Sequence, residues 1–126
     1  MIEVKIQDIV NSVAPMRALS ESKIKGATAY KVGKLLKRLE EEFGYFNDAR
    51  MGLINQYAVK DEEGNPIVED GNYQINKEFI NEFNEETNKL LQTEVSIDVA
   101  PIFVDDLSEV EITPQDMLLI EPFLTE

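Results

Sequence analysis

Hydrophobic residues recur every three or four positions over the longest patterned stretch of the chain. From about Ser22 to about Tyr57 they form one stripe of an amphipathic helix, made up of Val32, Leu35, Leu36, Leu39, Phe43, Phe46, Ala49, Leu53 and Tyr57. A helix of that length would span roughly 54 Å, whereas a compact domain of this size has a diameter of roughly 36 Å. The pattern therefore predicts either a break, at Gly44 or Gly52, or an elongated protein whose stripe needs a second chain.

A strand and a shorter helix are predicted before this long helix. Ile2, Val4 and Ile6 alternate with polar residues, which is typical of a half-buried strand. Helical spacing follows from Ile6 onward, and Pro15 is expected to end or kink that helix because proline has no backbone N–H.

The residues after Tyr57 predict a small sheet and two further helices. Residues 57–75 combine short apolar runs with turn-forming residues, which indicates a β-meander. Asn76 resembles the N-cap of a second helix, and residues 93–99 alternate as a strand does. Thr113 followed by Pro114 marks the start of a last short helix.

These elements together predict one α+β domain over residues 1–126: a long amphipathic helix, two or three shorter helices and a small antiparallel sheet. A chain of 126 residues has an ordinary single-domain size. The longest apolar runs, such as Met117–Ile120, are too short to cross a bilayer, so no membrane contact is expected. The first residues have neither the basic nor the apolar region of a signal peptide, and none is expected.

Charge is unevenly distributed along the chain, whose formal net charge is −13. Residues 17–38 hold seven basic residues and one acid, whereas residues 39–126 hold four basic residues and 22 acids. So large a negative charge repels phosphate backbones, and we do not expect direct binding of nucleic acid.

The side chains that perform most enzyme chemistry are absent, because the chain has no His and no Cys. Ser-His triads, Cys nucleophiles and conventional zinc sites are therefore excluded. The segment Asp61–Asn65 superficially resembles a calcium loop, but its glycine is fourth instead of sixth, and Asn72 stands where a Glu is needed. We expect a protein that is not an enzyme, with no catalytic residue, no cofactor and no metal.

Two charged surfaces are the candidate binding sites. The basic one lies on the outer face of the long helix and consists of Lys31, Lys34, Lys37 and Arg38. The acidic one lies in the last 35 residues, which hold nine acids and no basic residue, and consists of Asp105, Asp106, Glu109 and Glu111. For both sets the plainer alternative is a solvated surface above a packed core.

Several stretches occur in an order that resembles a known family. They are residues 27–42 (ATAYKVGKLLKRLEEE), 53–57 (LINQY), 61–66 (DEEGNP), 90–95 (LLQTEV) and 112–116 (ITPQD). The order is similar to that of a family of small acidic proteins encoded by tailed phages and prophages of Gram-positive bacteria. The resemblance implies a phage gene and a location in the cytoplasm of the infected host, leaves incorporation into the virion open, and implies no activity and no site residues.

Two functions are consistent with these features. The first is a non-catalytic phage protein that acts by stoichiometric binding to a phage or host protein, as a virion-assembly accessory, with self-association as a further expectation. The alternative is an acidic, nucleic-acid-mimicking inhibitor of a host DNA-handling or antiphage defence system. An assembly factor should present an apolar or dipolar surface that self-associates, whereas a mimic should hold its acids in a rigid, exposed array.

Overall fold

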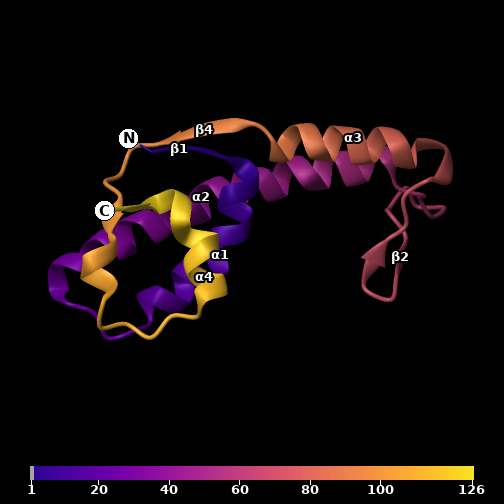
Figure 1. The fold of residues 1–126 in the computed structure, drawn as a ribbon. Helices are drawn as coiled ribbons and strands as arrows, with labels where there is room; N and C mark the ends of the chain where they lie inside the picture. Colours follow the sequence, from indigo (N-terminus) through magenta and orange to yellow (C-terminus); the bar gives the residue numbers. More distant parts are fainter. Residues whose placement is uncertain (1) are drawn as a thin grey trace. The chain divides into compact units, whose positions relative to one another are not determined.

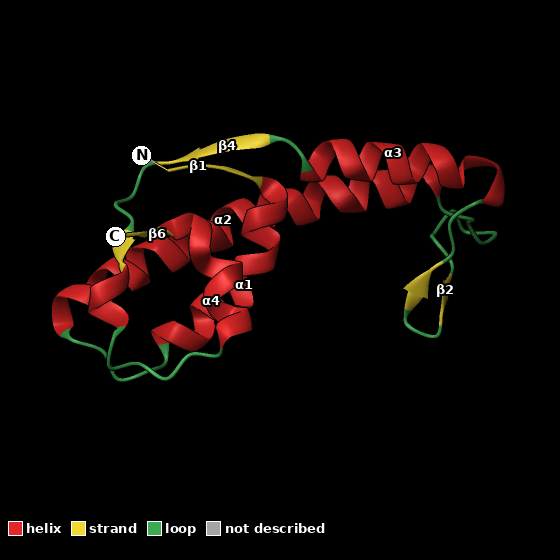
Figure 2. Cartoon of the chain, viewed as in Figure 1, coloured by secondary structure: helices red, strands yellow, loops and turns green. Residues whose placement is uncertain are grey.

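The computed structural model describes residues 2–126, which pack as two compact units (Figures 1 and 2). Unit 1 consists of residues 2–43 and 93–126, and unit 2 consists of residues 44–92. The long helix contributes its first half to unit 1 and its second half to unit 2. The expectation of a single domain over residues 1–126 stays a prediction, because packing as two units does not decide whether each folds alone.

Unit 1 is mainly helical and holds two small sheets. Strand β1 pairs antiparallel with β4, so that Ile2 lies opposite Ile97 and Lys5 opposite Glu94. Strand β5 pairs with β6 in parallel. In chain order the elements are β1 (Ile2–Lys5), α1 (Ile6–Ser20), the first half of α2 (Gly26–Tyr57), β4 (Glu94–Ile97), β5 (Ile102–Phe103), the 3-10 turn η2 (Val104–Leu107), α4 (Pro114–Ile120), the 3-10 turn η3 (Glu121–Phe123) and β6 (Leu124–Thr125).

One hydrophobic core holds unit 1 together. Every helix of the unit contributes to it, and so do both sheets. Burying one large aliphatic or aromatic side chain contributes about 1.5–3 kcal/mol, so this core is the main stabilising term of the unit. Its buried members are Ile2, Val4, Ile9, Val13, Met16, Leu19, Val32, Leu35, Leu39, Ile97, Ile102, Leu107, Ile120 and Phe123.

Helix α1 continues past Pro15 to Ser20, so proline does not end it, and the alternative that Pro15 kinks the helix stays a prediction. Proline removes one helical hydrogen bond and costs about 3 kcal/mol in a helix interior. The turn after Pro15 buries Met16 and Leu19 in the core, which offsets that cost. The hydroxyl of the buried Ser12 donates to the Ile9 carbonyl at 3.1 Å, so this polar group is also satisfied.

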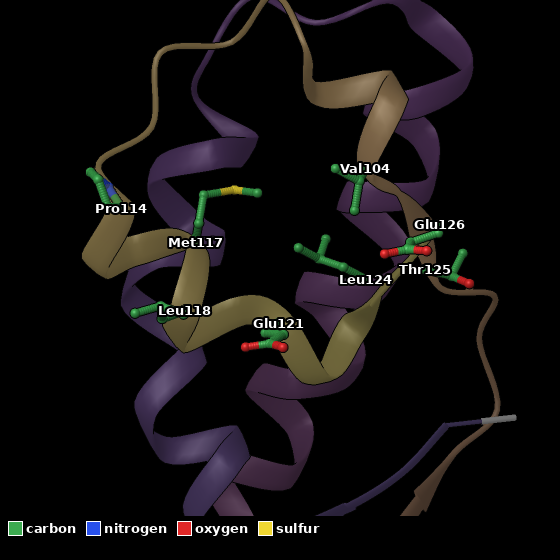
Figure 3. Close-up of a pocket in the computed structure, with 8 residues that line it drawn as sticks. All are labelled: Val104, Pro114, Met117, Leu118, Glu121, Leu124, Thr125 and Glu126. Atoms are coloured by element: carbon green, nitrogen blue, oxygen red, sulfur yellow. The ribbon is translucent and has the colours of Figure 1, made fainter.

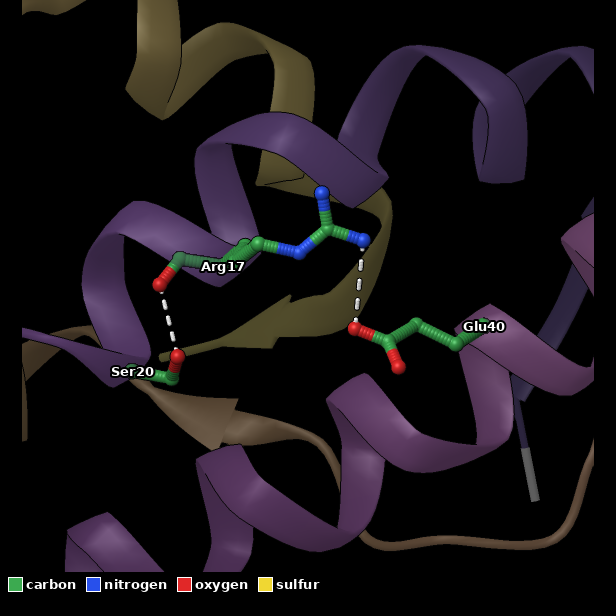
Figure 4. Close-up of polar contacts among 3 residues, drawn as sticks. All are labelled: Arg17, Ser20 and Glu40. Carbon is green, nitrogen blue, oxygen red and sulfur yellow. Dashed lines mark hydrogen bonds and ion pairs between the residues drawn. The ribbon is translucent and has the colours of Figure 1, made fainter.

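An ion pair connects α1 to α2 at the surface of unit 1 (Figure 4). The Arg17 guanidinium donates to a Glu40 carboxylate oxygen at 3.2 Å, and the Ser20 hydroxyl donates to the Arg17 carbonyl at 2.6 Å. Both members of the ion pair are about half exposed, so solvent screens it and it contributes about 0–1 kcal/mol. The core, and not this pair, holds the two helices together.

Helix α2 runs without a break from Gly26 to Tyr57, through both glycines at which a break was predicted. A helical glycine costs only about 0.5–1 kcal/mol relative to alanine, and buried side chains on either side of Gly52 outweigh that. The predicted stripe is confirmed in the first half of the helix. In the second half it is partly wrong, because Ala49 is exposed and Ile54, which the stripe omitted, is 2% exposed.

Unit 2 joins the second half of α2 to a β-meander and a second helix, as predicted. The meander is formed by β2 (Val68–Glu69), β3 (Asn72–Tyr73) and isolated bridges that pair Ala58 with Ile75 and Lys60 with Pro66. Asp70 (φ 52°) and Gly71 (φ 79°) make the tight turn, which needs two left-handed residues. The 3-10 turn η1 (Lys77–Phe79) then leads into α3 (Ile80–Leu91).

Helix α3 lies beside the second half of α2 (Figure 1) and is held by an aromatic cluster. The ring of Tyr57 lies 6.0 Å from that of Phe79 and 6.3 Å from that of Phe83, between centroids. No residue of α3 is fully buried. Unit 2 therefore leaves many large hydrophobic side chains at its surface: Tyr45, Val59, Val68, Tyr73, Phe79 and Ile80.

Both predicted helix caps are confirmed. The Asn76 side chain accepts from the Glu78 backbone N–H at 3.0 Å, although it caps η1 instead of α3 directly. The Thr113 hydroxyl accepts from the Asp116 N–H at 3.2 Å, and Pro114 is at the first position of α4. With one long helix and three shorter ones among residues 2–126, and with small antiparallel sheets, the α+β prediction is confirmed. The described strands form three two-stranded sheets, of which β5–β6 is parallel.

Replacing Leu39 by alanine should lower the free energy of unfolding by about 2–5 kcal/mol, because the fully buried side chain leaves a cavity in the core of unit 1. Chemical denaturation measures the change. Lys37→Ala on the exposed face of the same helix is the control and should change stability by less than about 0.5 kcal/mol. A loss below that figure for Leu39→Ala would contradict the core assignment.

Thr113→Ala should destabilise unit 1 by about 1 kcal/mol, because the Asp116 N–H loses its acceptor at the start of α4. Thr113→Ser keeps the hydroxyl and should retain most of the stability. Thermal unfolding followed by circular dichroism compares the two variants. Equal losses for both would show that the methyl group, and not the cap, matters at this position.

Candidate protein-binding surface

Among the described residues of unit 1, four large hydrophobic side chains are exposed, and they lie on α2, on α4 and where β5 passes into η2. Tyr30, in the second turn of α2, is 67% exposed, and Leu118, on α4, is 68% exposed. Phe103 and Val104, where β5 passes into η2, are also exposed. Such side chains are informative when they gather, because contiguous exposed apolar patches mark interaction sites.

A groove connects Val104 with Leu118 (Figure 3). It has a volume of about 840 Å³ and is mainly apolar. Figure 3 shows Met117 and Leu124 pointing toward one another across it, from α4 and β6. The carboxylates of Glu121 and Glu126 make its edge acidic. Its lining consists of Val104, Pro114, Met117, Leu118, Glu121, Leu124, Thr125 and Glu126.

Two lysines lie against exposed aromatic rings of unit 1. The Lys31 ammonium lies 5.0 Å from the centroid of the Phe103 ring, and that of Lys34 lies 5.3 Å from the centroid of the Tyr30 ring. Each is a cation–π contact, worth about 0.5–1 kcal/mol at an exposed site. Phe103 is followed directly by Val104, which lines the groove, and it pairs across β5 and β6 with Thr125, which lines the groove too. We call the whole the unit 1 patch: Tyr30, Lys31, Lys34, Phe103 and the residues of the groove.

The structure divides the predicted basic face. Lys31 and Lys34 belong to the unit 1 patch, and they line a hollow of about 280 Å³ together with Tyr30 and the acidic Asp98. Lys37 is exposed on the same helix. Arg38 is instead engaged by its own helix, in ion pairs with Glu41 at 3.7 Å and with Glu42. Arg38 is therefore the member of the set least free to meet a partner.

The predicted acidic surface is divided too. Asp105, Asp106 and Glu109 line a hollow of about 320 Å³ together with Lys23 and Lys25. Glu111 lines a separate hollow that it shares with Asp116 and with residues of α1, Pro15 among them. Three of the four acids thus face a surface that also carries lysines, which lowers the negative potential there.

Other charged groups have local structural roles. The Asp61 carboxylate accepts from the backbone N–H groups of Glu63 and Asn65, at 2.9 and 3.0 Å, so it shapes the meander loop. Within residues 2–126 no cluster of three or more metal-binding side chains occurs. On α3, the carboxylates of Glu86 and Glu85 raise the pKa of Lys89.

Sequence reasoning missed the groove, although a signal for it was present. Met117–Ile120 are four successive apolar residues in a helix of only seven. Because a helix turns by about 100° per residue, four successive side chains cannot all face one core. Ile120 faces the core, and Leu118 is left outside. Exposure of Phe103 had no comparable signal, because it depends on how β5 pairs.

Comparison with known proteins finds no family model, no curated protein and no solved structure that matches this chain. None of the helices described in residues 2–126 combines the length and the apolar character needed to cross a membrane.

Replacing Asp105, Asp106, Glu109 and Glu111 together by Asn or Gln should leave the fold intact, with a change in unfolding free energy of at most about 1 kcal/mol. Exposed carboxylates contribute little to stability, and these form no ion pair within the described residues. Urea denaturation measures the change. A loss of several kcal/mol would show that the acids bind Lys23 and Lys25 far more strongly than their exposure implies.

Proposed function

We propose that this chain is a non-catalytic, phage-encoded protein that acts by binding another protein in a fixed ratio, as an accessory of virion assembly. The observation that carries the proposal is the unit 1 patch, where exposed apolar side chains adjoin a groove with acidic edges and a pair of lysines. Aromatic anchors beside desolvated pockets carry most of the binding energy in protein interfaces. The phage setting rests on the resemblance described above.

The distribution of charge supports assembly over nucleic-acid mimicry. A mimic needs acids in an uninterrupted array, because it must reproduce the phosphate spacing that a basic groove reads. Here the acids at 105, 106 and 109 share their hollow with two lysines. The unit 1 patch is apolar in its centre and carries both signs of charge, which suits a protein partner.

Affinity capture from cells infected by the phage that carries the gene tests the proposal. The variants Tyr30→Ala and Leu118→Asp remove apolar anchors of the unit 1 patch. Tyr45→Ala is the matched control, because Tyr45 is also on α2 and is 66% exposed, but belongs to unit 2.

Wild type and Tyr45→Ala should retain the same phage or host protein at the same molar ratio. The two patch variants should lose about tenfold or more of it, the usual effect of removing an interface anchor. Loss of capture on neutralising the acids at 105, 106, 109 and 111, with Leu118→Asp still binding, would favour the mimic. If none of these variants changes the amount of partner that is captured, the unit 1 patch has no part in the function.

A further inference from the structure

We infer that unit 1 holds a separate small-molecule site, which binds a free α-amino acid with an apolar side chain. The site is the hollow of about 320 Å³ where the residues at the start of α2 meet those of η2 and of the loop after it. The inference goes beyond the proposed function, and the hollow shares no residue with the unit 1 patch.

The start of α2 offers hydrogen-bond donors to a negative group. The Ala29 N–H donates to the Lys25 carbonyl at 2.7 Å. Within residues 2–126, the backbone N–H groups at positions 26 to 28, just before it, have no acceptor. The first turn also holds no acidic side chain that would offset the positive end of the helix dipole. A carboxylate on a ligand would be stabilised at this end of the helix.

A buried hydroxyl points to a ligand independently of the helix dipole. Thr28 is 5% exposed and lines the hollow. Within residues 2–126 its hydroxyl makes no hydrogen bond, yet the one enclosed side-chain polar atom without a partner in that range is the Thr87 hydroxyl. The Thr28 hydroxyl is therefore not enclosed, and it opens into the hollow. Since buried polar groups nearly always have a partner, this hydroxyl is placed to bind a ligand oxygen.

Charges of both signs line the hollow without meeting. Lys23 and Lys25 come from the α2 side, and Asp105, Asp106 and Glu109 from the other. Within residues 2–126 no carboxylate lies within 4.0 Å of either lysine. A purely anionic ligand would face the carboxylates, and a purely cationic one would face the lysines and the helix N-terminus. A ligand that carries a carboxylate and an ammonium on one carbon atom satisfies both sides.

The inner side of the hollow is apolar. Ile24 and Val110 line it, and both pack against the core of unit 1. A ligand side chain that contacts them needs to be apolar, because a polar group buried there would lack a partner. Branched aliphatic amino acids such as leucine combine such a side chain with both charged groups. The volume of the hollow lies at the lower end of the range for small-molecule sites, about 300–1,000 Å³.

An NMR titration of the isotope-labelled full chain with three probes tests the site. L-leucine carries both charged groups, 4-methylpentanoate has the same carbon skeleton without the ammonium, and 3-methylbutylamine lacks the carboxylate. L-leucine should bind with a Kd below about 1 mM and should shift the backbone amide signals of residues 26–28. Each of the other two probes should bind about tenfold or more weakly, because each loses one charged contact.

Variants of Thr28 test the hydroxyl. Thr28→Val removes it while keeping a branched side chain, and should weaken the binding of both L-leucine and 4-methylpentanoate about threefold or more. Thr28→Ser retains the hydroxyl and should bind both probes like wild type. Lys37→Ala is a further control, because Lys37 is exposed on the same helix and lies outside the hollow.

A variant of the acidic side separates the two charges of the ligand. Asp105→Asn together with Asp106→Asn should weaken L-leucine about fivefold or more, because the ammonium loses two carboxylates. The same variant should bind 4-methylpentanoate more tightly than wild type does, because those carboxylates repel it. These opposite changes cannot come from partial unfolding, which would weaken both probes alike.

Three outcomes overturn the inference. The first is no binding of L-leucine, L-isoleucine or L-valine at up to about 5 mM. The second is equal binding of L-leucine and the two probes that lack one charge. The third is unchanged L-leucine affinity in the doubly Asn-substituted variant, whose exposed side chains leave the fold intact. Tyr30→Ala and Leu118→Asp should bind L-leucine like wild type, so this site and the proposed function are tested separately.

Discussion

Burial of one face of α2 by the rest of unit 1 is the constraint from which the other features of that unit follow. Val32, Leu35 and Leu39 are fully buried against α1, α4 and the strands. At about 100° per residue, Tyr30, Lys34 and Lys37 then lie on the opposite side of the helix. The exposure of Tyr30 and Lys34 in the unit 1 patch is thus a geometric consequence of the core, because no rotation of α2 can bury these two side chains and also keep Val32, Leu35 and Leu39 buried.

Much of the fold could be predicted from the sequence where one periodicity dominated. The alternation of Ile2 and Val4, the stripe from Val32 to Leu39 and the cap at Thr113 all predicted the observed elements, since each depends on neighbours a few residues away. Predictions failed where distant packing decided the outcome. Helix α1 passes Pro15 because Met16 and Leu19 are buried by other segments, which local propensity does not register.

The candidate site was harder to predict than the fold for the same reason. Charge counts identified Lys31 and Lys34, but they equally selected Arg38, whose own helix supplies its carboxylate partners. They also selected the acids at 105, 106 and 109 without the lysines that share their hollow, because Lys23 and Lys25 are some 80 residues away in the sequence. A surface assembled from distant segments is visible only once the chain has folded.

The pairing of β1 with β4 joins residues 2–5 to residues 94–97, and the whole of unit 2 lies between them in the chain. Contacts so distant in sequence form slowly, because a long loop must close before any of them contributes. The ribosome has synthesised all of unit 2 before β4 is available to pair with β1. The core of unit 1 is complete only after Ile120 and Phe123 have also been synthesised. Until then, Ile9, Val13 and Leu35 lack some of the side chains that bury them in the folded protein. Synthesis itself therefore imposes an order of assembly, in which the locally connected unit 2 can form first and the N-terminal segment is completed last.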